Sequence, residues 1–221
     1  MWGYLFKTMY IPSANAETHL PVLRQMMSAH PLAAVVTLGS DGLIATHMPL
    51  VLEDDGSEFG VLKGHVSRAN PQWRNPAAGV DALAIFSGPQ HYISPNWYPG
   101  KLDDGKEVPT WNYVVVHASG PLRIVEDAAW LLAHLNALTD THEAASPLPW
   151  KVSDAPADFI ASLLNGIVGF ELPIRKLEGK WKVSQNRNEA DRHGAVEGLS
   201  QLGTKESSVM ARLISDATRG K

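Results

Sequence analysis

The stretch LAAVVTLGSDGLIATHMPLVLED, residues 32–54, indicates how this chain folds. It holds two runs of apolar and β-branched residues, and these runs flank Gly39-Ser40-Asp41-Gly42. Glycine and aspartate in a short connection between two such runs are typical of a β-hairpin. We therefore expect two antiparallel strands here, and with them an antiparallel sheet.

Downstream of the hairpin, three more segments have the composition of strands: residues 57–66, 81–95 and 111–127. The connection between the last two, residues 96–110, is rich in Pro, Gly and Asp, and we expect a long ordered loop there. Residues 167–187 return to a strand pattern, in which Glu178-Gly179 predicts a second hairpin.

Helical spacing appears on both sides of this β-rich region. Upstream, Leu23 and Met27 fall on one face of residues 13–31, a segment that we expect Ser13 to cap. Downstream, Asp127 is the expected N-cap of a helix with an apolar face. The expected downstream helices cover residues 127–143, 154–166, 188–200 and 204–220.

This order of elements predicts a mainly β fold with α additions (α+β), built on a small antiparallel β-barrel. No obvious linker interrupts the chain, so we expect one domain rather than two. Its parts are an N-terminal extension over residues 1–8, a barrel core over 9–126, and a helical region over 127–221 that includes the last barrel strands.

Composition narrows the classes of function. The chain has 221 residues and a formal net charge of -4, which argues against a long nucleic-acid contact because such contacts need a basic stripe. It has no cysteine, which excludes disulfides, thiolate nucleophiles and cysteine-bound metal clusters. The opening MWGYLFKTMY is too short to span a bilayer, and no signal-peptide cleavage site follows it. We expect a cytoplasmic protein without a membrane partner.

Polar side chains are unusually dense in GHVSRANPQW, residues 64–73. A phosphate dianion is bound by guanidinium, hydroxyl and N–H donors around one point, and Ser67 and Arg68 offer two of these groups. In an extended strand His65 and Ser67 share one face and Arg68 points to the other, so a bend is needed to aim Arg68 at the same ligand. The alternative is a polar surface loop in which Asn70 caps a turn. Residue types alone leave both interpretations open.

Three other groups of residues are candidates for binding. Histidines lie in or beside predicted strands, but no spacing typical of a metal site is present, so we expect no metal. Aromatic residues around the 96–110 loop could wall a planar ring whose polar edge Asn112 reads, or could simply be core. The third group is the polar cluster KVSQNRNEADR, residues 182–192, which could be a helix cap around Asn186 or Asn188 or half of a shared site.

Taken in order, these segments resemble the PaiB-type family of FMN-binding split-barrel proteins, which are described as negative transcriptional regulators. More distantly, the chain resembles pyridoxamine-phosphate oxidase-like flavoproteins. The resemblance covers residues 9 to 215 and is carried by MYIP (9–12), THMP (46–49), GHVSRANPQW (64–73), YISPNWYP (92–99), VPTWNYVVVHASG (108–120) and KVSQNR (182–187).

The resemblance implies a six-stranded antiparallel split β-barrel with C-terminal helices, which forms a homodimer and binds FMN at the subunit interface. By position, it implies that the phosphate and ribityl side of FMN is bound by Lys63, His65, Ser67, Arg68 and Asn70, with Thr46 and His47 on the adjacent strand. It implies that the ring or ribityl chain is approached by Trp111 and Asn112, with Ser184, Gln185 and Arg187 on a C-terminal strand that could come from the second subunit. It names no catalytic residue.

Three hypotheses about function remain open. A flavin-linked regulator is the first, although DNA contact is weakly supported because the C-terminal helices carry mixed charges. A flavin-dependent oxidoreductase or FMN reductase acting on a small planar substrate is the second, and it would show nicotinamide-driven flavin reduction. A binding protein for haem or another planar ligand is the third, and haem would show a Soret band on reconstitution.

Overall fold

The structure is a computed structural model that describes residues 9–40, 42–74 and 76–217. The expected extension over residues 1–8 lies outside the described residues. The strands are β1 (Ala16–Glu17), β2 (Leu32–Gly39), β3 (Gly42–Pro49), β4 (Val51–Glu53), β5 (Val61–Ser67), β6 (Ala82–Ile93), β7 (Thr110–Gly120), β8 (Arg123–Val125), β9 (Ile167–Pro173) and β10 (Lys176–Lys182). The α-helices are α1 (Leu20–Ala29), α2 (Lys101–Asp104), α3 (Ala128–Glu143), α4 (Ala157–Leu164), α5 (Glu189–Leu202) and α6 (Lys205–Asp216), and 3₁₀ turns are η1 (Ser13–Asn15), η2 (Pro71–Trp73), η3 (Pro95–Trp97) and η4 (Val152–Asp154).

The described chain divides into two compact units made of interleaved segments. The first unit comprises residues 9–19, 87–116 and 178–217. The second comprises residues 20–86 and 117–177, apart from the two positions not described. Strands β6 and β7 each begin in one unit and continue into the other, so neither unit is a continuous piece of sequence.

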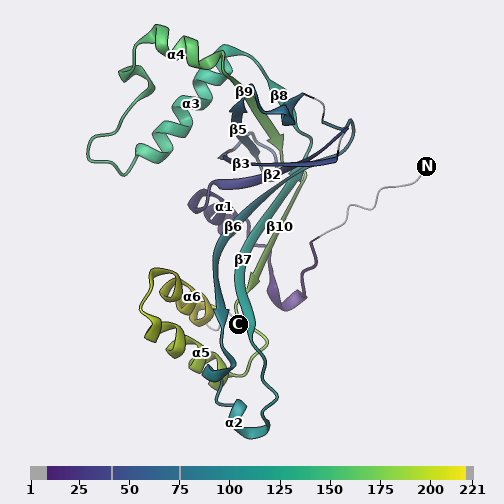
Figure 1. The fold of residues 1–221 in the computed structure, drawn as a ribbon, viewed down its shortest axis with the longest axis vertical. Helices are drawn as coiled ribbons and strands as arrows, with labels where there is room; N and C mark the ends of the chain where they lie inside the picture. Colours follow the sequence, from purple (N-terminus) through teal and green to yellow (C-terminus); the bar gives the residue numbers. More distant parts are fainter. Residues whose placement is uncertain (1–8, 41, 75, 218–221) are drawn as a thin grey trace, which may run out of the picture. The chain divides into compact units, whose positions relative to one another are not determined.

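The second unit holds two antiparallel sheet portions (Figure 1). In one, the hydrogen-bonded order is β6-β2-β3, and Gly39 pairs with Gly42 at the end of the β2–β3 hairpin. In the other, the order is β4-β5-β9-β8. Strand β2 alternates buried and more exposed positions, and the core includes Met27, Met48 and Phe170, which are almost fully buried. This pairing fixes the ends of β3 and β5, which the site uses.

The first unit joins an antiparallel sheet portion, ordered β1-β10-β7-β6, to two helices, α5 and α6, which lie side by side (Figure 1). Asn188 caps α5 by accepting a hydrogen bond from the backbone N–H of Asp191 (2.8 Å), which confirms one of the two roles considered for this polar cluster. Helix α5 also packs closely on η3, because Gly194 and Gly198 leave room for Trp97.

The structure confirms a mixed α and β fold with antiparallel strands, the β2–β3 hairpin, and Asp127 as the N-cap of α3. A closed six-stranded barrel is not confirmed, since the sheets formed by the described residues do not close. The expected boundary at residue 126, between a barrel core and a helical region of one domain, stays a prediction. No helix among the described residues is both long and apolar enough to cross a membrane.

Two expectations about local structure are wrong. Ser13 does not cap a long helix: it begins η1, and α1 starts only at Leu20. The intervening residues Ala16 and Glu17 form β1 and pair with β10, and Pro21 suits the first turn of α1 because a helix leaves that N–H without a partner. Glu178-Gly179 is not a hairpin turn either. Both residues lie inside β10, which pairs with β1, whereas β9 pairs with β5 and β8.

Candidate functional site

A groove of about 510 Å³ lies in the second unit, at the ends of β3 and β5 and beside the turn from α4 into β9. Its polar wall comes from β3 and from the corner that follows β5, and its third side comes from a segment about one hundred positions further along the chain. The lining residues are Thr46, His47, Met48, Pro49, His65, Val66, Ser67, Asn70, Leu163, Gly166 and Ile167. Five of the predicted binding residues therefore meet at one place.

The hydroxyl groups of Thr46 and Ser67 line this groove, and each has an O–H donor that no described contact uses. Thr46 Oγ1 accepts a hydrogen bond from Asn70 Nδ2 (2.9 Å), and Ser67 Oγ accepts one from the backbone N–H of Ala69 (3.3 Å). Among the described residues, no acceptor takes the proton of either hydroxyl. Because each hydroxyl has a single O–H donor, both can donate to a ligand.

The side chain of Asn70 holds the corner after β5, residues 68–73, through two hydrogen bonds. Its Oδ1 accepts from the backbone N–H of Gln72 (2.9 Å) and so caps η2, while its Nδ2 holds Thr46. Gln72 is buried and donates from Nε2 to the backbone oxygen of Val35 (2.9 Å) and to Thr37 Oγ1 (3.1 Å). The corner is thus tied to the β2–β3 hairpin, which makes it a rigid support for the two hydroxyls.

His65 is the groove's second kind of donor. Its Nδ1 lies 3.1 Å from Nε2 of His134, a buried residue of α3, and the ring of His134 stacks on that of Trp130. Nδ1 of His134 is buried without a described hydrogen-bond partner. A proton there would leave an N–H unsatisfied, so we place it on Nε2, from which it is donated to His65. His65 then keeps its own proton on Nε2.

Burial keeps this histidine pair neutral. It lowers the pKa of His65 from the ordinary 6.5. Burial, followed by the positive charge that His65 or Lys63 would carry, lowers the pKa of His134 to about 4. The groove accordingly offers neutral donors, among them two hydroxyls and the imidazole N–H of His65.

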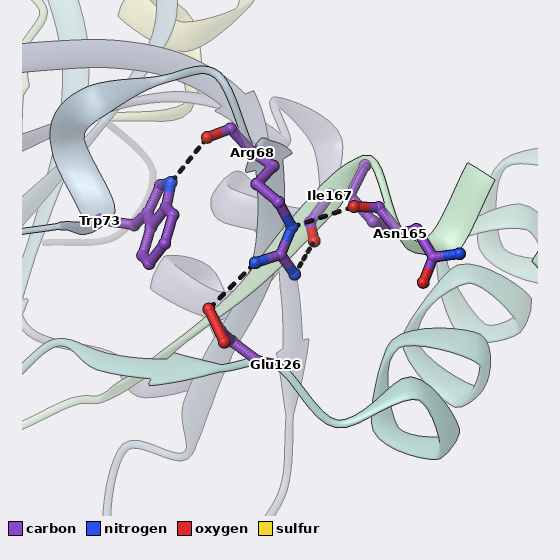
Figure 2. Close-up of polar contacts among 5 residues, drawn as sticks. All are labelled: Arg68, Trp73, Glu126, Asn165 and Ile167. Atoms are coloured by element: carbon purple, nitrogen blue, oxygen red, sulfur yellow. Dashed lines mark hydrogen bonds and ion pairs between the residues drawn. The ribbon is translucent and has the colours of Figure 1, made fainter. Parts of the chain in front are cut away.

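The two predicted cations of this region are not among the residues that line the groove. Lys63 forms an ion pair with Glu53 and lies 5.8 Å from the centre of the Trp130 ring. Arg68 donates from Nε to the backbone oxygen of Asn165 (2.9 Å), from Nη2 to that of Ile167 (3.2 Å), and from Nη1 to Glu126 Oε1 (3.1 Å), as Figure 2 shows. Whether either residue contacts a phosphate stays a prediction.

The other five predicted residues belong to the first unit. Trp111 is half exposed, donates to Gln90 Oε1 (3.0 Å) and meets the ring of Tyr92 edge to face. Asn112 is buried, and its Nδ2 donates to Ser184 Oγ (2.9 Å) while its Oδ1 has no described partner. Ser184 has a φ of 63°, which is unusual for a residue other than glycine.

Gln185 and Arg187 are engaged within the same unit. Gln185 Oε1 accepts from the backbone N–H of Val183 (2.8 Å), and its Nε2 donates to the backbone oxygen of Trp181. Arg187 pairs with Glu107 and lies 4.4 Å from the centre of the Tyr98 ring. Burial raises the pKa of Tyr98. The polar contacts described for these five residues lie within the first unit. Their contact with a flavin stays a prediction.

Sequence reasoning missed the third side of the groove and the partners of the predicted residues. Leu163, Gly166 and Ile167 carry no polar side chain, so no motif indicated them. Arg68 binds backbone oxygens of Asn165 and Ile167, which any residue type would supply. In the sequence, His134 is one residue on the apolar face of the helix expected from residue 127, and no signal indicated its contact with His65. Within residues 9–40, 42–74 and 76–217, no group of three or more His, Asp and Glu side chains could hold a metal ion.

Comparison with known proteins identifies the family of this chain. Residues 9–176 match the family model described as "Putative FMN-binding domain". The chain is also 32% identical over 208 residues to the Protease synthase and sporulation protein PAI 2 of Bacillus subtilis, in an alignment that covers 94% of this chain and 97% of that protein. The chain belongs to the FMN-binding domain family, whose PaiB-like members it resembles throughout its length.

Solved structures support the fold at lower identity. The flavocytochrome Anf3 of Azotobacter vinelandii is 16% identical, with a TM-score of 0.58 over 80% of this chain and 74% of that one. An FAD and heme binding protein of Mycobacterium smegmatis is also 16% identical, with a TM-score of 0.53 over 76% and 73% of the two chains. These similarities place the chain among split-barrel folds.

Proposed function

We propose that this protein binds FMN and that the groove at the ends of β3 and β5 receives the phosphate. One observation carries the proposal: the hydroxyls of Thr46 and Ser67, each with a free O–H donor, line a groove in a chain of the FMN-binding family. The Nε2–H of His65 adds a third donor. Phosphate oxygens are strong acceptors, and charge-assisted hydrogen bonds are about twice as strong as neutral ones.

The chain's own residues would bind and orient the cofactor. Asn70 holds Thr46 in place, and His134 holds His65, so the donors are fixed before the ligand arrives. Fixed donors favour binding because less conformational entropy is lost. When bound, FMN would supply redox chemistry that none of these side chains can perform alone. Lys63 does not line the groove and is paired with Glu53, and it would contribute a positive charge from β5, two residues before His65.

The location of the phosphate can be tested with Ser67→Ala and Thr46→Val, which remove one hydroxyl each. Losing a hydrogen bond to a charged group costs about 1.5–3 kcal/mol, so each variant should weaken FMN binding by about tenfold or more. Riboflavin lacks the phosphate, and its affinity should change less than about twofold. Flavin fluorescence titration measures both constants.

Ser162→Ala is the matched control, because Ser162 is an exposed serine on α4 that does not line the groove. It should bind both flavins as the unsubstituted protein does. Variants of Ser67 and Thr46 that bind FMN normally, or that weaken FMN and riboflavin equally, would place the phosphate elsewhere.

We further propose a homodimer with a regulatory role, in which Trp111, Asn112, Ser184, Gln185 and Arg187 approach the flavin ring or ribityl chain. Support comes from the family resemblance and from the name of the Bacillus subtilis relative, which links that protein to protease synthesis and sporulation. Direct DNA contact is the weaker route, because α5 and α6 carry Glu189, Glu197, Glu206 and Asp216 beside their basic residues. This role depends on flavin binding, and titrations that show none would remove it.

A further inference from the structure

Arg68 holds the turn that leads from α4 into β9. Its backbone N–H donates to the oxygen of Gly166 (2.8 Å), its Nε to that of Asn165 (2.9 Å) and its Nη2 to that of Ile167 (3.2 Å). One residue thus binds three consecutive carbonyl groups, two of them through the guanidinium (Figure 2).

Two more contacts fix the guanidinium itself. Nη1 donates to Glu126, in the connection between β8 and α3, and the group lies 5.7 Å from the centre of the Trp73 ring. Trp73 is in turn held by its own Nε1–H, which donates to the backbone oxygen of Arg68 (3.0 Å; Figure 2). The ion pair with Glu126 is half exposed and contributes little by itself, so the carbonyl contacts dominate.

The segment that Arg68 holds forms one side of the groove. Gly166 and Ile167 line the groove together with Leu163 from the last turn of α4, whereas Arg68 itself does not. The hydroxyls lie beside this segment: Ser67 pairs with Ile167 across β5 and β9, and Thr46 lies on β3. Arg68 therefore holds the turn that forms the apolar side of the groove, and it does not itself line the groove.

The chemistry of arginine suits this task. A guanidinium presents donors in one rigid plane and can bind two carbonyls and a carboxylate at once, whereas a lysine ammonium is a single point charge. Three of its nitrogen atoms each already serve one of these acceptors. Two of its five N–H donors remain, but the guanidinium does not line the groove that would receive the phosphate.

We infer that Arg68 is a positioning residue, which keeps the α4–β9 turn in place as a side of the groove and does not bind the phosphate. This inference rests on the proposed function, because the groove is taken as the FMN site. The two neighbours in the GHVSRANPQW corner then have different roles: Ser67 lines the groove, and Arg68 holds the adjoining turn at residues 165–167.

The test compares FMN and riboflavin affinities of Arg68→Ala and Arg68→Lys by fluorescence titration. The apolar side of the groove would contact the ribityl chain, which FMN and riboflavin share. A positioning role therefore predicts that Arg68→Ala weakens both flavins by the same factor, about fivefold or more, so that the ratio of the two affinities stays within about twofold. Arg68→Lys should rescue little, since lysine cannot reproduce the planar contacts. Loss of FMN affinity alone, or no loss of either, would overturn the inference.

A second readout does not depend on flavin. Hydrogen exchange of the amides in residues 163–168 should be about fivefold faster or more in ligand-free Arg68→Ala, while the core of β2 and β6 keeps its protection. Arg74→Ala is the matched control, because Arg74 also lies over the Trp73 ring, at 5.5 Å, yet no described contact joins it to the turn. Unchanged exchange in Arg68→Ala would overturn the inference. A protein that binds no FMN but shows faster exchange would instead remove only the proposed function.

Discussion

At the residue scale, the surroundings of a buried polar side chain determine its protonation state. His134 is an example: it lies under Trp130, faces His65, and has one ring nitrogen without a described partner. An imidazole in this position must stay neutral, because a charge there would be desolvated and would face a second titratable ring. Lys63, paired with Glu53, adds a positive charge nearby, and Glu171 binds Trp130 Nε1 rather than either histidine.

This arrangement predicts a pH dependence of stability. His134 binds a proton near pH 6.5 when unfolded and near pH 4 when folded. The stabilisation is complete above pH 6.5 and is lost as pH falls from 6.5 towards 4, by about 3 kcal/mol. Urea unfolding at several pH values should show this loss, and His134→Gln should reduce it. His19→Gln, at an exposed histidine, should not. Equal pH slopes for the protein and His134→Gln would contradict the account.

At the element scale, close packing depends on glycines at specific places. Helix α5 lies on η3 with Gly194 and Gly198 against Trp97, and a Cβ at Gly194 would overlap the backbone oxygen of Trp97. In a free helix alanine is better than glycine by about 1 kcal/mol. Here the overlap is with backbone, which cannot move aside as a side chain could, so the steric cost should exceed that gain.

We therefore expect Gly194→Ala to lower the free energy of unfolding by about 2–3 kcal/mol, although alanine favours helices. Ser200→Ala on the exposed side of the same helix should be neutral or slightly stabilising. Chemical denaturation of both variants gives the comparison. If Gly194→Ala proved as stable as the unsubstituted protein, the packing of α5 on η3 would have to be different.

Local signals predicted many of these elements correctly. The β2–β3 hairpin follows from its turn residues, and the start of α3 follows from Asp127, since both depend on neighbours in sequence. The pairing of β9 with β5 and of β10 with β1 could not be predicted, because strand partners are chosen by contacts across the whole chain. The Glu178-Gly179 signal failed for this reason.

At the scale of the whole molecule, the candidate site was predicted in part. The residues of GHVSRANPQW and THMP that were expected to act together do meet, because β3 and β5 end at the same groove. The third side was not predictable: Gly166 and Ile167 act through position and backbone, and they lie about one hundred residues away in the chain. The match to the FMN-binding domain family indicates a flavin as the class of ligand. The geometry of the groove does not specify that class.

The most direct test of the central claim, that this protein binds FMN, is size-exclusion chromatography with visible absorption recorded on the protein peak after loading with FMN. We predict flavin absorption that coelutes with the protein at about one FMN per chain, and light scattering on the same peak should give the mass of a dimer. A colourless protein peak, or a Soret band without flavin bands, would contradict it.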